Sequence, residues 1–328
     1  MTVALMLLQY TYMKKFMKKL PSIRLPRIKK PNWNYKKLAV RISIIAALLL
    51  VTSSYVAYKR LYLTNERRFW IAMNNNLSTK SVVQTVESGG TGNKDIEKTR
   101  FNFGIEASID KISTVSSKTA TTLSNVSTRT ITTPSAQYVS YLNIDTSEVK
   151  ADGSSYDFSS VKGVWAKMTD AANNEEKDNL LLNYIQPHVT VLPFSNLDAG
   201  TRSSFIKEIR SSGAYEINFA DSTVIEKDGK KYIAYPVNIQ LKKYVSLLQK
   251  NFNLMGYGTF PALDTERYKE GSHYSATILV DPSSNNFYSV QTDNQVETYG
   301  NYGVFSRAPV PQNYLTMAEL QEKLQKLQ

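Results

Sequence analysis

Residues 228–255, DGKKYIAYPVNIQLKKYVSLLQKNFNLM, decide the fold. They begin with Asp228-Gly229, a dipeptide typical of two-residue hairpin turns, which we expect to join an alternating strand at 215–219 to a returning strand at 232–237. The chain then continues into a helix. The apolar stripe of this helix is formed by Leu241, Tyr244, Val245, Leu248, Phe252 and Met255. A hairpin followed at once by an amphipathic helix predicts an antiparallel sheet with the helix lying on it.

The flanking sequence predicts more antiparallel strands. Apolar and polar residues alternate over 101–109, which predicts a strand with one buried face. The Ser/Thr-rich stretch 111–133 favours two strands with polar outer faces, and a disordered mucin-like linker is the alternative. Further strands are predicted at 137–143, 163–168, 275–281, 286–292 and 304–307. Helices are predicted at 66–77, 174–186, 198–213 and after Thr316, where Thr316 and Glu319 form a capping box. The fold class is therefore α+β.

A stretch of seventeen uncharged residues, 42–58, predicts a transmembrane helix near the N-terminus. At ~1.5 Å per residue it would extend roughly 26 Å, near the lower limit for a hydrocarbon core of about 30 Å. Arg41 and Lys59 bracket it, and their charged ends can reach the headgroups. The residues expected to form this anchor are Arg41, Ile42, Leu48, Leu49, Leu50, Tyr58 and Lys59. A cleaved signal peptide is the alternative.

The N-terminal tail, residues 1–41, contains eleven Lys and Arg residues and no acidic residue. By the positive-inside rule this tail stays in the cytoplasm, which places the folded part of a single-pass protein in the cell membrane outside the cytoplasm. Anionic lipid at the membrane surface is the partner that we expect for the tail. Nucleic acid is disfavoured, because prolines interrupt the basic clusters and no nucleic-acid-binding motif accompanies them.

Composition supports three regions: a basic tail at 1–41, the apolar segment at 42–58 and an extracytoplasmic α+β domain at 59–328. The chain has no cysteine, so neither a disulfide framework nor a lipidated cysteine is available to it. The last region must therefore be stabilised by its own hydrophobic core.

Residues able to do chemistry are few. His188 and His273 are the two histidines, and neither has carboxylates or a second histidine at metal-ligand spacing. Two Ser-x-x-Lys spacings, at 147–150 and 159–162, lack the companion motifs of penicillin-binding enzymes. Asp264 and Glu266 are better explained as part of a tyrosine-rich loop than as an acid pair. We therefore expect no catalysis, no cofactor and no metal.

Aromatic residues are dense between Phe252 and Phe305. They are expected to fill the core between helix and sheet, with the lining of an apolar ligand cavity or a sugar-stacking surface as alternatives.

Four stretches, 69–73, 163–167, 228–232 leading into 237–248, and 278–282, occur in an order that resembles the LolA-like carrier fold. That family includes periplasmic lipoprotein carriers and mycobacterial lipid-carrier lipoproteins. The resemblance implies a strongly curved antiparallel sheet, an incomplete barrel, covered by helices and enclosing an apolar cavity. The residues expected to line such a cavity are Phe101, Phe103, Ile105, Trp165, Tyr235, Tyr244, Leu248, Phe252, Tyr274 and Ile278.

Two functions follow as hypotheses. The first is a membrane-anchored, non-catalytic domain that binds a lipid, a lipoprotein or another apolar component of the cell envelope. The second is a cell-surface interaction protein that contacts another protein or a wall glycan without an apolar cavity.

Overall fold

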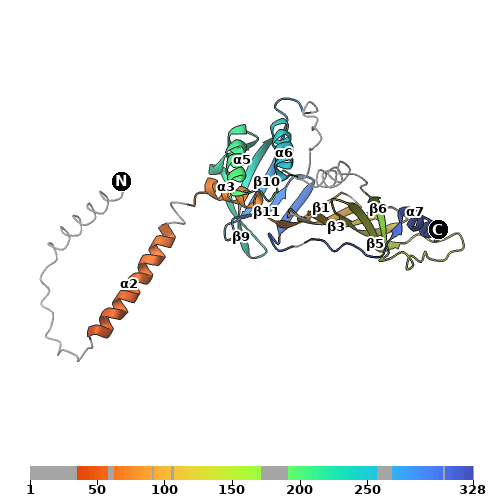
Figure 1. Ribbon diagram of the computed structural model, residues 1–328, viewed down its shortest axis with the longest axis horizontal. Coiled ribbons are helices and arrows are strands. Elements are labelled where there is room, and N and C mark those ends of the chain that lie inside the picture. Colours follow the sequence, from red (N-terminus) through yellow and green to blue (C-terminus); the bar gives the residue numbers. More distant parts are fainter. Residues whose placement is uncertain are drawn as a thin grey trace. The chain divides into compact units, whose positions relative to one another are not determined.

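The computed structural model describes residues 35–57, 63–90, 92–104, 107–170, 191–256, 268–305 and 307–327. The chain divides into two compact units, Met1–Leu61 and Tyr62–Gln328 (Figure 1). The predicted helix at 174–186, Ile105, Tyr58, Lys59, His188, Asp264 and Glu266 lie outside the described residues.

The first unit contains helix α2, Tyr35–Ala57. It begins ahead of the predicted segment, because the lysine, leucine, alanine and arginine at 36–41 are good helix formers. Ile42, Leu48, Leu49 and Leu50 are exposed on it. The hydroxyl of Thr52 donates a hydrogen bond to the carbonyl of Leu48 at 2.9 Å.

No helix in the described part of the chain is long and apolar enough to cross a membrane. The structure therefore does not support the transmembrane prediction for residues 42–58. The uncharged part of α2, residues 42–57, is shorter than the ~20 apolar residues that usually cross a hydrocarbon core, and Arg41 lies within the same helix.

The second unit is built on one open sheet. Its strands are β1 Ser81–Gly90, β2 Asn93–Asn102, β3 Ser108–Lys118, β4 Leu123–Thr132, β5 Ala136–Thr146, β6 Trp165–Asp170, β7 Tyr215–Ile217, β8 Thr223–Lys227, β9 Lys230–Gln240, β10 His273–Asp281, β11 Asn286–Gln291, β12 Gln295–Gly300 and β13 Leu315–Thr316. They follow the order β13-β6-β5-β4-β3-β2-β1-β12-β11-β10-β9-β7, and β8 pairs with another part of β9. Among the described strands all pairings are antiparallel except that of β13 with β6. The α+β prediction is confirmed.

The helices of this unit gather at two places along the sheet. Helices α3 (Asn65–Asn76), α5 (Ala199–Ser212) and α6 (Leu241–Met255) pack near β9, β10 and β11. Helix α7 (Met317–Gln325) packs beside β6 and β13 at the other end (Figure 1). The predicted capping box is confirmed, since the Thr316 hydroxyl accepts from the Glu319 amide and the Glu319 carboxylate accepts from the Thr316 amide.

The hairpin prediction at Asp228-Gly229 is correct for the turn and wrong for the partner strand. Asp228 and Gly229 have φ of 52° and 70°, the positive values that such a turn requires. The turn joins β8 to β9, whereas Tyr215 lies opposite Ile239 at the far end of β9. Strand β9 is long enough to pair with both segments on one side.

Other strand predictions have mixed outcomes. The stretch 111–133 forms strands, which are the end of β3 and β4, and it is not a mucin-like linker. The prediction of one strand over 101–109 is wrong, because β2 ends at Asn102 and the Phe103 amide donates to the Lys80 carbonyl at 2.8 Å. The strand predicted at 304–307 is also wrong: residues 301–314 contain no strand where they are described. β8, β12 and β13 were not predicted.

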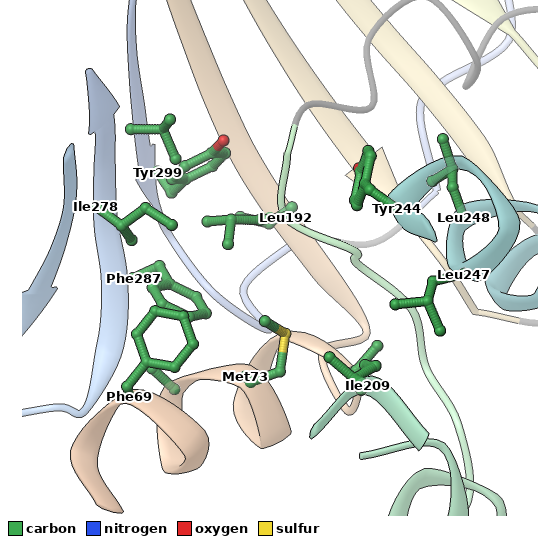
Figure 2. Packing of buried hydrophobic residues seen from close by; sticks show 14 of the residues in the cluster. Phe69, Met73, Leu192, Ile209, Tyr244, Leu247, Leu248, Ile278, Phe287 and Tyr299 are labelled. Atoms are coloured by element: carbon green, nitrogen blue, oxygen red, sulfur yellow. The ribbon is translucent and has the colours of Figure 1, made fainter. Parts of the chain in front are cut away.

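The sheet has an inner and an outer face. Val82, Phe101 and Ile109 lie opposite one another on β1, β2 and β3 and belong to the main hydrophobic core, so their side of the sheet is the inner face. Alternation then assigns their sequence neighbours to the outer face. The main core joins this inner face to α3, α5 and α6; Figure 2 shows Phe69 and Met73 from α3, and Tyr244, Leu247 and Leu248 from α6, within it.

The outer face carries a segment that we name the C-terminal strap, the described residues between 303 and 314. The Phe305 amide donates to the Ser81 hydroxyl at 2.9 Å, and the Ala308 amide donates to the Ser108 hydroxyl at 3.0 Å. Near its end the Tyr314 ring packs edge-on against Tyr138, with centroids 5.3 Å apart. The strap leads into β13 and α7. That helix packs on a second apolar cluster, which includes Val139, Tyr141, Ala166 and Leu320.

Candidate functional site

Most of the residues predicted to line a cavity meet in one place. The main core contains Phe101, Phe103, Tyr235, Tyr244, Leu248, Phe252 and Ile278. All of them are buried, and Tyr235, Phe252 and Ile278 have no exposed surface. The phenol of Tyr235 donates to the Asn65 carbonyl at 2.9 Å, which ties β9 to the start of α3. The sequence pattern therefore located an apolar cluster on the inner face.

Two predicted lining residues lie elsewhere. Trp165 is on β6 opposite Ser140, on the outer face, where the Arg129 guanidinium lies 5.8 Å from its ring centroid. Tyr274 on β10 is 40% exposed, so it is not part of the core. Ile105 lies outside the described residues. The local sequence does not show which face of β6 is buried. The register of β6 against β5 places Trp165 on the outer face.

Helix α6 supplies one wall of the apolar cluster. Tyr244, Val245, Leu248 and Phe252 follow the helical repeat and are buried, as the sequence predicted. The helix ends at Gly256, which has a φ of 73°, a left-handed conformation that suits glycine. Asn251 lies on the same buried stripe, two turns after Tyr244. A polar side chain thus enters the core from this helix.

A group of polar side chains adjoins the apolar cluster on the inner face. We name it the polar junction: Gln84 on β1, Gln295, Glu297 and Tyr299 on β12, and Asn251 on α6. Tyr299 lies opposite Gln84, and Glu297 lies opposite Val86 and Val290. The Glu297 side chain is a carboxylate in a residue only 6% exposed.

Neutral side chains donate hydrogen bonds to this carboxylate. The Tyr299 phenol donates to Glu297 Oε2 at 2.5 Å, the Gln84 amide donates to the same oxygen at 3.5 Å, and the Gln295 amide donates to Oε1 at 2.6 Å. Burial, together with the negative charge of Glu297, raises the pKa of the Tyr244 phenol, which is therefore neutral at physiological pH. The charge of Glu297 thus acts on both β12 and α6.

Two buried oxygens at the junction have no hydrogen-bond partner among the described residues: Gln84 Oε1 and Asn251 Oδ1. Their identity as oxygens follows from the bonds that the other half of each amide makes. Gln84 Nε2 faces a carboxylate, and Asn251 Nδ2 donates to the Phe194 carbonyl at 3.2 Å, and neither partner can donate. Both unpaired atoms are therefore acceptors, and an unpaired buried acceptor costs about 1–3 kcal/mol.

Beyond the junction, the inner face of β2, β3 and β4 becomes polar. Thr99, Lys111 and Thr130 lie opposite one another, and Lys111 Nζ is 3.1 Å from Glu97 Oε1. This polar band separates the main core from the second apolar cluster under α7. The inner face therefore changes from apolar to polar within the width of two strands.

The sequence did not point to the polar junction. Glu297 and Tyr299 lie on β12, a strand that was not predicted, and no role was predicted for Gln84. One signal was present: Gln295, Glu297 and Tyr299 alternate with Val296 and Thr298, which is the period of a strand.

The outer face holds a charged group that the sequence also did not indicate. Arg129 binds Asp110 through two hydrogen bonds, Nε to Oδ1 at 2.8 Å and Nη2 to Oδ2 at 2.9 Å. Arg100 approaches the same carboxylate at 3.5 Å and also lies over the Phe305 ring of the strap. This two-point geometry is typical of a strong ion pair. Its contacts with the strap fit a structural role.

Two open hollows lie at the surface. One, of about 570 Å³, lies at the ends of hairpins and is lined by glycine, serine, asparagine and lysine residues that include Gly92, Lys94, Lys118 and Ser124, with Leu123 at its wall. The other, of about 500 Å³, lies over β7, β9 and β10 and is lined by Glu216, Asp221 and Asp293 together with uncharged residues.

The residues weighed for catalysis are dispersed. The hydroxyl of Ser147 accepts from the Leu123 amide, whereas Lys150 lies over the Tyr156 ring. The Ser159 amide binds Asp157, and Lys162 donates to Asn143. His273 is exposed at the start of β10. In the described part of the chain, no three His, Cys, Asp or Glu residues are grouped as a metal site would require.

Comparisons with known proteins add little. No family model matches the chain, and no curated protein matches it. Among solved structures, LprF from Mycobacterium bovis is similar over 76% of this chain and 97% of its own, with 12% sequence identity and a TM-score of 0.36. A likeness this weak carries no argument about function, and the resemblance to LolA-like carriers stays a prediction.

Proposed function

We propose that the folded unit is a non-catalytic binding module for an amphipathic, lipid-like molecule, which it holds at the inner face of the sheet. One observation carries the proposal: at the polar junction the apolar core meets buried side chains whose oxygens Gln84 Oε1 and Asn251 Oδ1 have no partner in the described structure. A ligand with an apolar tail and a polar end matches that change of polarity.

Two energy terms favour such a ligand. Each methylene that moves from water to an apolar environment contributes about 0.8 kcal/mol, so a tail against Tyr244, Leu248 and Phe252 gains affinity with length. A polar end that donates a hydrogen bond to one of the buried oxygens removes the cost of leaving that oxygen unpaired. Helix α6 carries the apolar Tyr244, Leu248 and Phe252 as well as the polar Asn251. Displacement of this helix from the sheet would therefore open the site.

Tryptophan fluorescence can test the site. Trp70 on α3 belongs to the main core, whereas Trp165 lies on the outer face. We propose to prepare the full chain with one of these two as its single tryptophan, the others being replaced by phenylalanine, and to titrate both variants with brominated dodecyl maltoside. Bromine quenches only at short range, so Trp70 should lose fluorescence and Trp165 should keep it.

Unbrominated dodecyl maltoside is the control, because it separates quenching from a change in structure. Equal quenching of both tryptophans indicates non-specific micelle binding and contradicts the proposal, and so does the absence of quenching in a folded protein.

A second function is favoured by the hollow at the hairpin ends. Its open shape and its serine, asparagine and lysine lining suit contact with another protein or a wall glycan, which was the second sequence hypothesis. Replacing Leu123, which is 56% exposed there, by Lys would weaken such contact in a pull-down from cell-envelope extract and leave amphiphile binding unchanged.

Where the folded unit acts is also a proposal. If residues 42–58 cross the membrane, the positive charge of residues 1–41, with no acidic residue, places the folded unit outside the cytoplasm. Protease added to intact cells would remove the folded unit if that location is correct and would leave it intact if the unit is inside.

A further inference from the structure

We infer that the hollow at the hairpin ends is a binding site for an uncharged glycan chain. This inference is independent of the amphiphile site. It rests on the second function proposed above for the hollow and narrows that function to one of its two partner classes. Three features carry it: the position of the hollow on the sheet, the chemistry of its lining and an apolar strip beside it.

The hollow is centred on one row of side chains, which we name the end row. Its members lie opposite one another on β1 to β5, in the order Gly90, Asn93, Ser117, Ser124 and Thr146. All other lining residues are immediate sequence neighbours of these members. Alternation places the end row on the inner face, and at ~4.8 Å per strand it spans roughly 14 Å from β2 to β5. Such a row suits a chain of several units.

The end row offers hydrogen-bonding groups without charge. The hydroxyls of Ser117 and Ser124 and the amide of Asn93 can each donate and accept, and none of these side chains has a hydrogen-bond partner among the described residues. The Thr146 hydroxyl accepts from the Glu148 amide at 3.1 Å and keeps its own hydrogen to donate. The hydroxyls of a glycan also donate and accept, and they recur on every ring. A glycan therefore matches the row along its length.

The charges around the hollow disfavour an acidic ligand. Lys94, Lys118 and Asp145 alternate with members of the end row, so their side chains belong to the outer face. On that face Lys94 is 3.7 Å from Glu87. The inner-face residue that follows the row along β2 is Asp95, an acid. A carboxylate or phosphate at the row would thus lie beside a like charge, which an uncharged glycan avoids.

An apolar strip runs beside the end row on the same face. Val115, Val126 and Ile144 lie opposite one another on β3, β4 and β5, each two residues from a member of the row. Val115 is 46% exposed. A sugar ring has hydroxyls at its edge and C–H groups on its face, so it can pair with the row and cover the strip. A protein partner usually inserts aromatic anchors into an apolar pocket, and the small polar lining of this hollow offers no such pocket.

Gly90 allows the hollow to be blocked without strain. A Cβ added there meets no atom within 4 Å, and Gly90 does not have the left-handed φ that requires glycine. Gly90→Leu places an aliphatic side chain in the hollow that offers neither a hydrogen bond nor a ring for stacking. Gly300 is the matched control: a Cβ there also meets no atom within 4 Å, and it lies opposite Val83, at the other end of β1.

The test titrates the full chain at neutral pH with two uncharged tetrasaccharides, cellotetraose and chitotetraose, and with glucose and tetragalacturonate. Isothermal titration calorimetry should show at least one uncharged tetrasaccharide binding about tenfold more tightly than glucose, and more tightly than tetragalacturonate. Gly90→Leu should weaken this binding about tenfold. The double variant Ser117→Ala, Ser124→Ala should do the same, because it removes two hydrogen bonds to the ligand.

Two controls should bind as the wild type does. They are Gly300→Leu and Ser116→Ala, which removes a hydroxyl from the outer face one position from the end row. Circular dichroism and thermal unfolding show that each variant is folded before its affinity is compared. Binding that is as strong in Gly90→Leu and in the double serine variant as in the wild type overturns the inference, and so does a preference for tetragalacturonate.

The remaining outcomes separate the inference from the second function. If neither uncharged tetrasaccharide binds the folded wild-type chain, while the pull-down still captures a protein in a way that depends on Leu123, the second function stands with a protein as its partner and the inference is overturned. If neither glycan nor protein binds at the hollow, the second function fails as well.

Discussion

A buried carboxylate on the outer face of the sheet and one on the inner face have different hydrogen-bond partners. On the outer face, Asp110 is bound at both oxygens by the Arg129 guanidinium and is approached by Arg100. On the inner face, Glu297 receives hydrogen bonds from the neutral side chains of Gln84, Gln295 and Tyr299. The first arrangement neutralises a charge and fixes the strap region. The second surrounds a carboxylate with amide and phenol donors of the polar junction, next to the buried oxygen Gln84 Oε1.

The apolar contents of the two faces differ as well. The inner face has the large main core, whereas the outer face near β9 and β10 has a small cluster of Tyr232, Ala234 and Leu279 with Tyr288 packed against it. Under the proposed function, the inner face serves both stability and ligand binding, whereas the outer face serves stability alone. The predictions below test that division, beginning with the largest expected effect.

Truncation of Phe69 should cost the most. Its ring contacts Trp70, Phe219, Tyr235 and Phe287 with centroids between 5.3 and 6.0 Å, and it has no exposed surface. Phe69→Ala should lower the free energy of unfolding by about 4 kcal/mol in urea denaturation. Tyr288→Ala, which removes an aromatic ring from the outer cluster, should cost less than half as much. Equal losses would mean that the two faces contribute alike.

Breaking the outer-face ion pair should have the next largest effect. Arg129→Met leaves the Asp110 carboxylate, whose side chain is 5% exposed, without its main partner, and we expect a loss of about 3 kcal/mol. The double variant Asp110→Leu, Arg129→Met removes both charges and should recover most of that loss. Amphiphile binding at the inner face should stay unchanged in both variants. A double variant no more stable than the single one would contradict this account of the outer face.

Alkaline pH should weaken the inner face through its buried phenols. Burial raises the pKa of Tyr302, and burial together with the charge of Glu297 raises the pKa of Tyr244. A phenol whose pKa is raised by folding stabilises the protein fully below its unfolded pKa of about 10, and this contribution is lost as the pH rises above that value. At pH 10.5 the two phenols together should account for a loss of about 2 kcal/mol.

The contribution of these phenols can be isolated with the double variant Tyr244→Phe, Tyr302→Phe. Unfolding by urea at pH 8 and at pH 10.5 should show a smaller pH-dependent loss for this variant than for the wild type. Replacing the exposed Tyr314 by Phe is the control and should leave the pH dependence as it is. A double variant as sensitive to alkali as the wild type would show that other groups cause the loss.

The smallest effect is expected at the helix that covers the second cluster. Thr316→Ala removes the hydroxyl that accepts from the Glu319 amide and should cost about 1 kcal/mol. Hydrogen bonds from Thr316 to the Glu319 carboxylate lower the pKa of Glu319. In the wild type, the stabilisation that this carboxylate gives is therefore lost as the pH falls through the acidic range. Urea denaturation at pH 7 measures the loss, with the exposed Thr121→Ala as control. A loss as large as that of Phe69→Ala would mean that α7 unfolds with the main core.

Local patterns in the sequence predicted much of this fold. The stripe of α6, the turn at Asp228-Gly229 and the capping box at Thr316 each depend on neighbours within a few residues, and each is present. Pairing over long distances was harder. The strand that contains Tyr215 pairs with β9 next to β8, a strand that the sequence did not predict. The face on which Trp165 lies depends on the register of β5 and β6.

The site was predicted only on its apolar side. Apolar residues such as Phe252 and Ile278 reveal their burial by periodicity, whereas a buried polar residue has the same sequence signature as a surface one. Gln84 lies on β1 and Asn251 on α6, and both are buried by tertiary packing between segments far apart in the sequence. The polar junction is therefore a property of the fold, and a single sequence does not disclose it.

Hydrogen–deuterium exchange of the full chain, with and without dodecyl maltoside below its micelle-forming concentration, tests the central claim most directly. We predict slower exchange in α6 and β12, which carry the polar junction, and unchanged exchange in the C-terminal strap on the outer face. Slower exchange in the strap with no change in α6 would contradict the account, because it would place the ligand on the wrong face of the sheet.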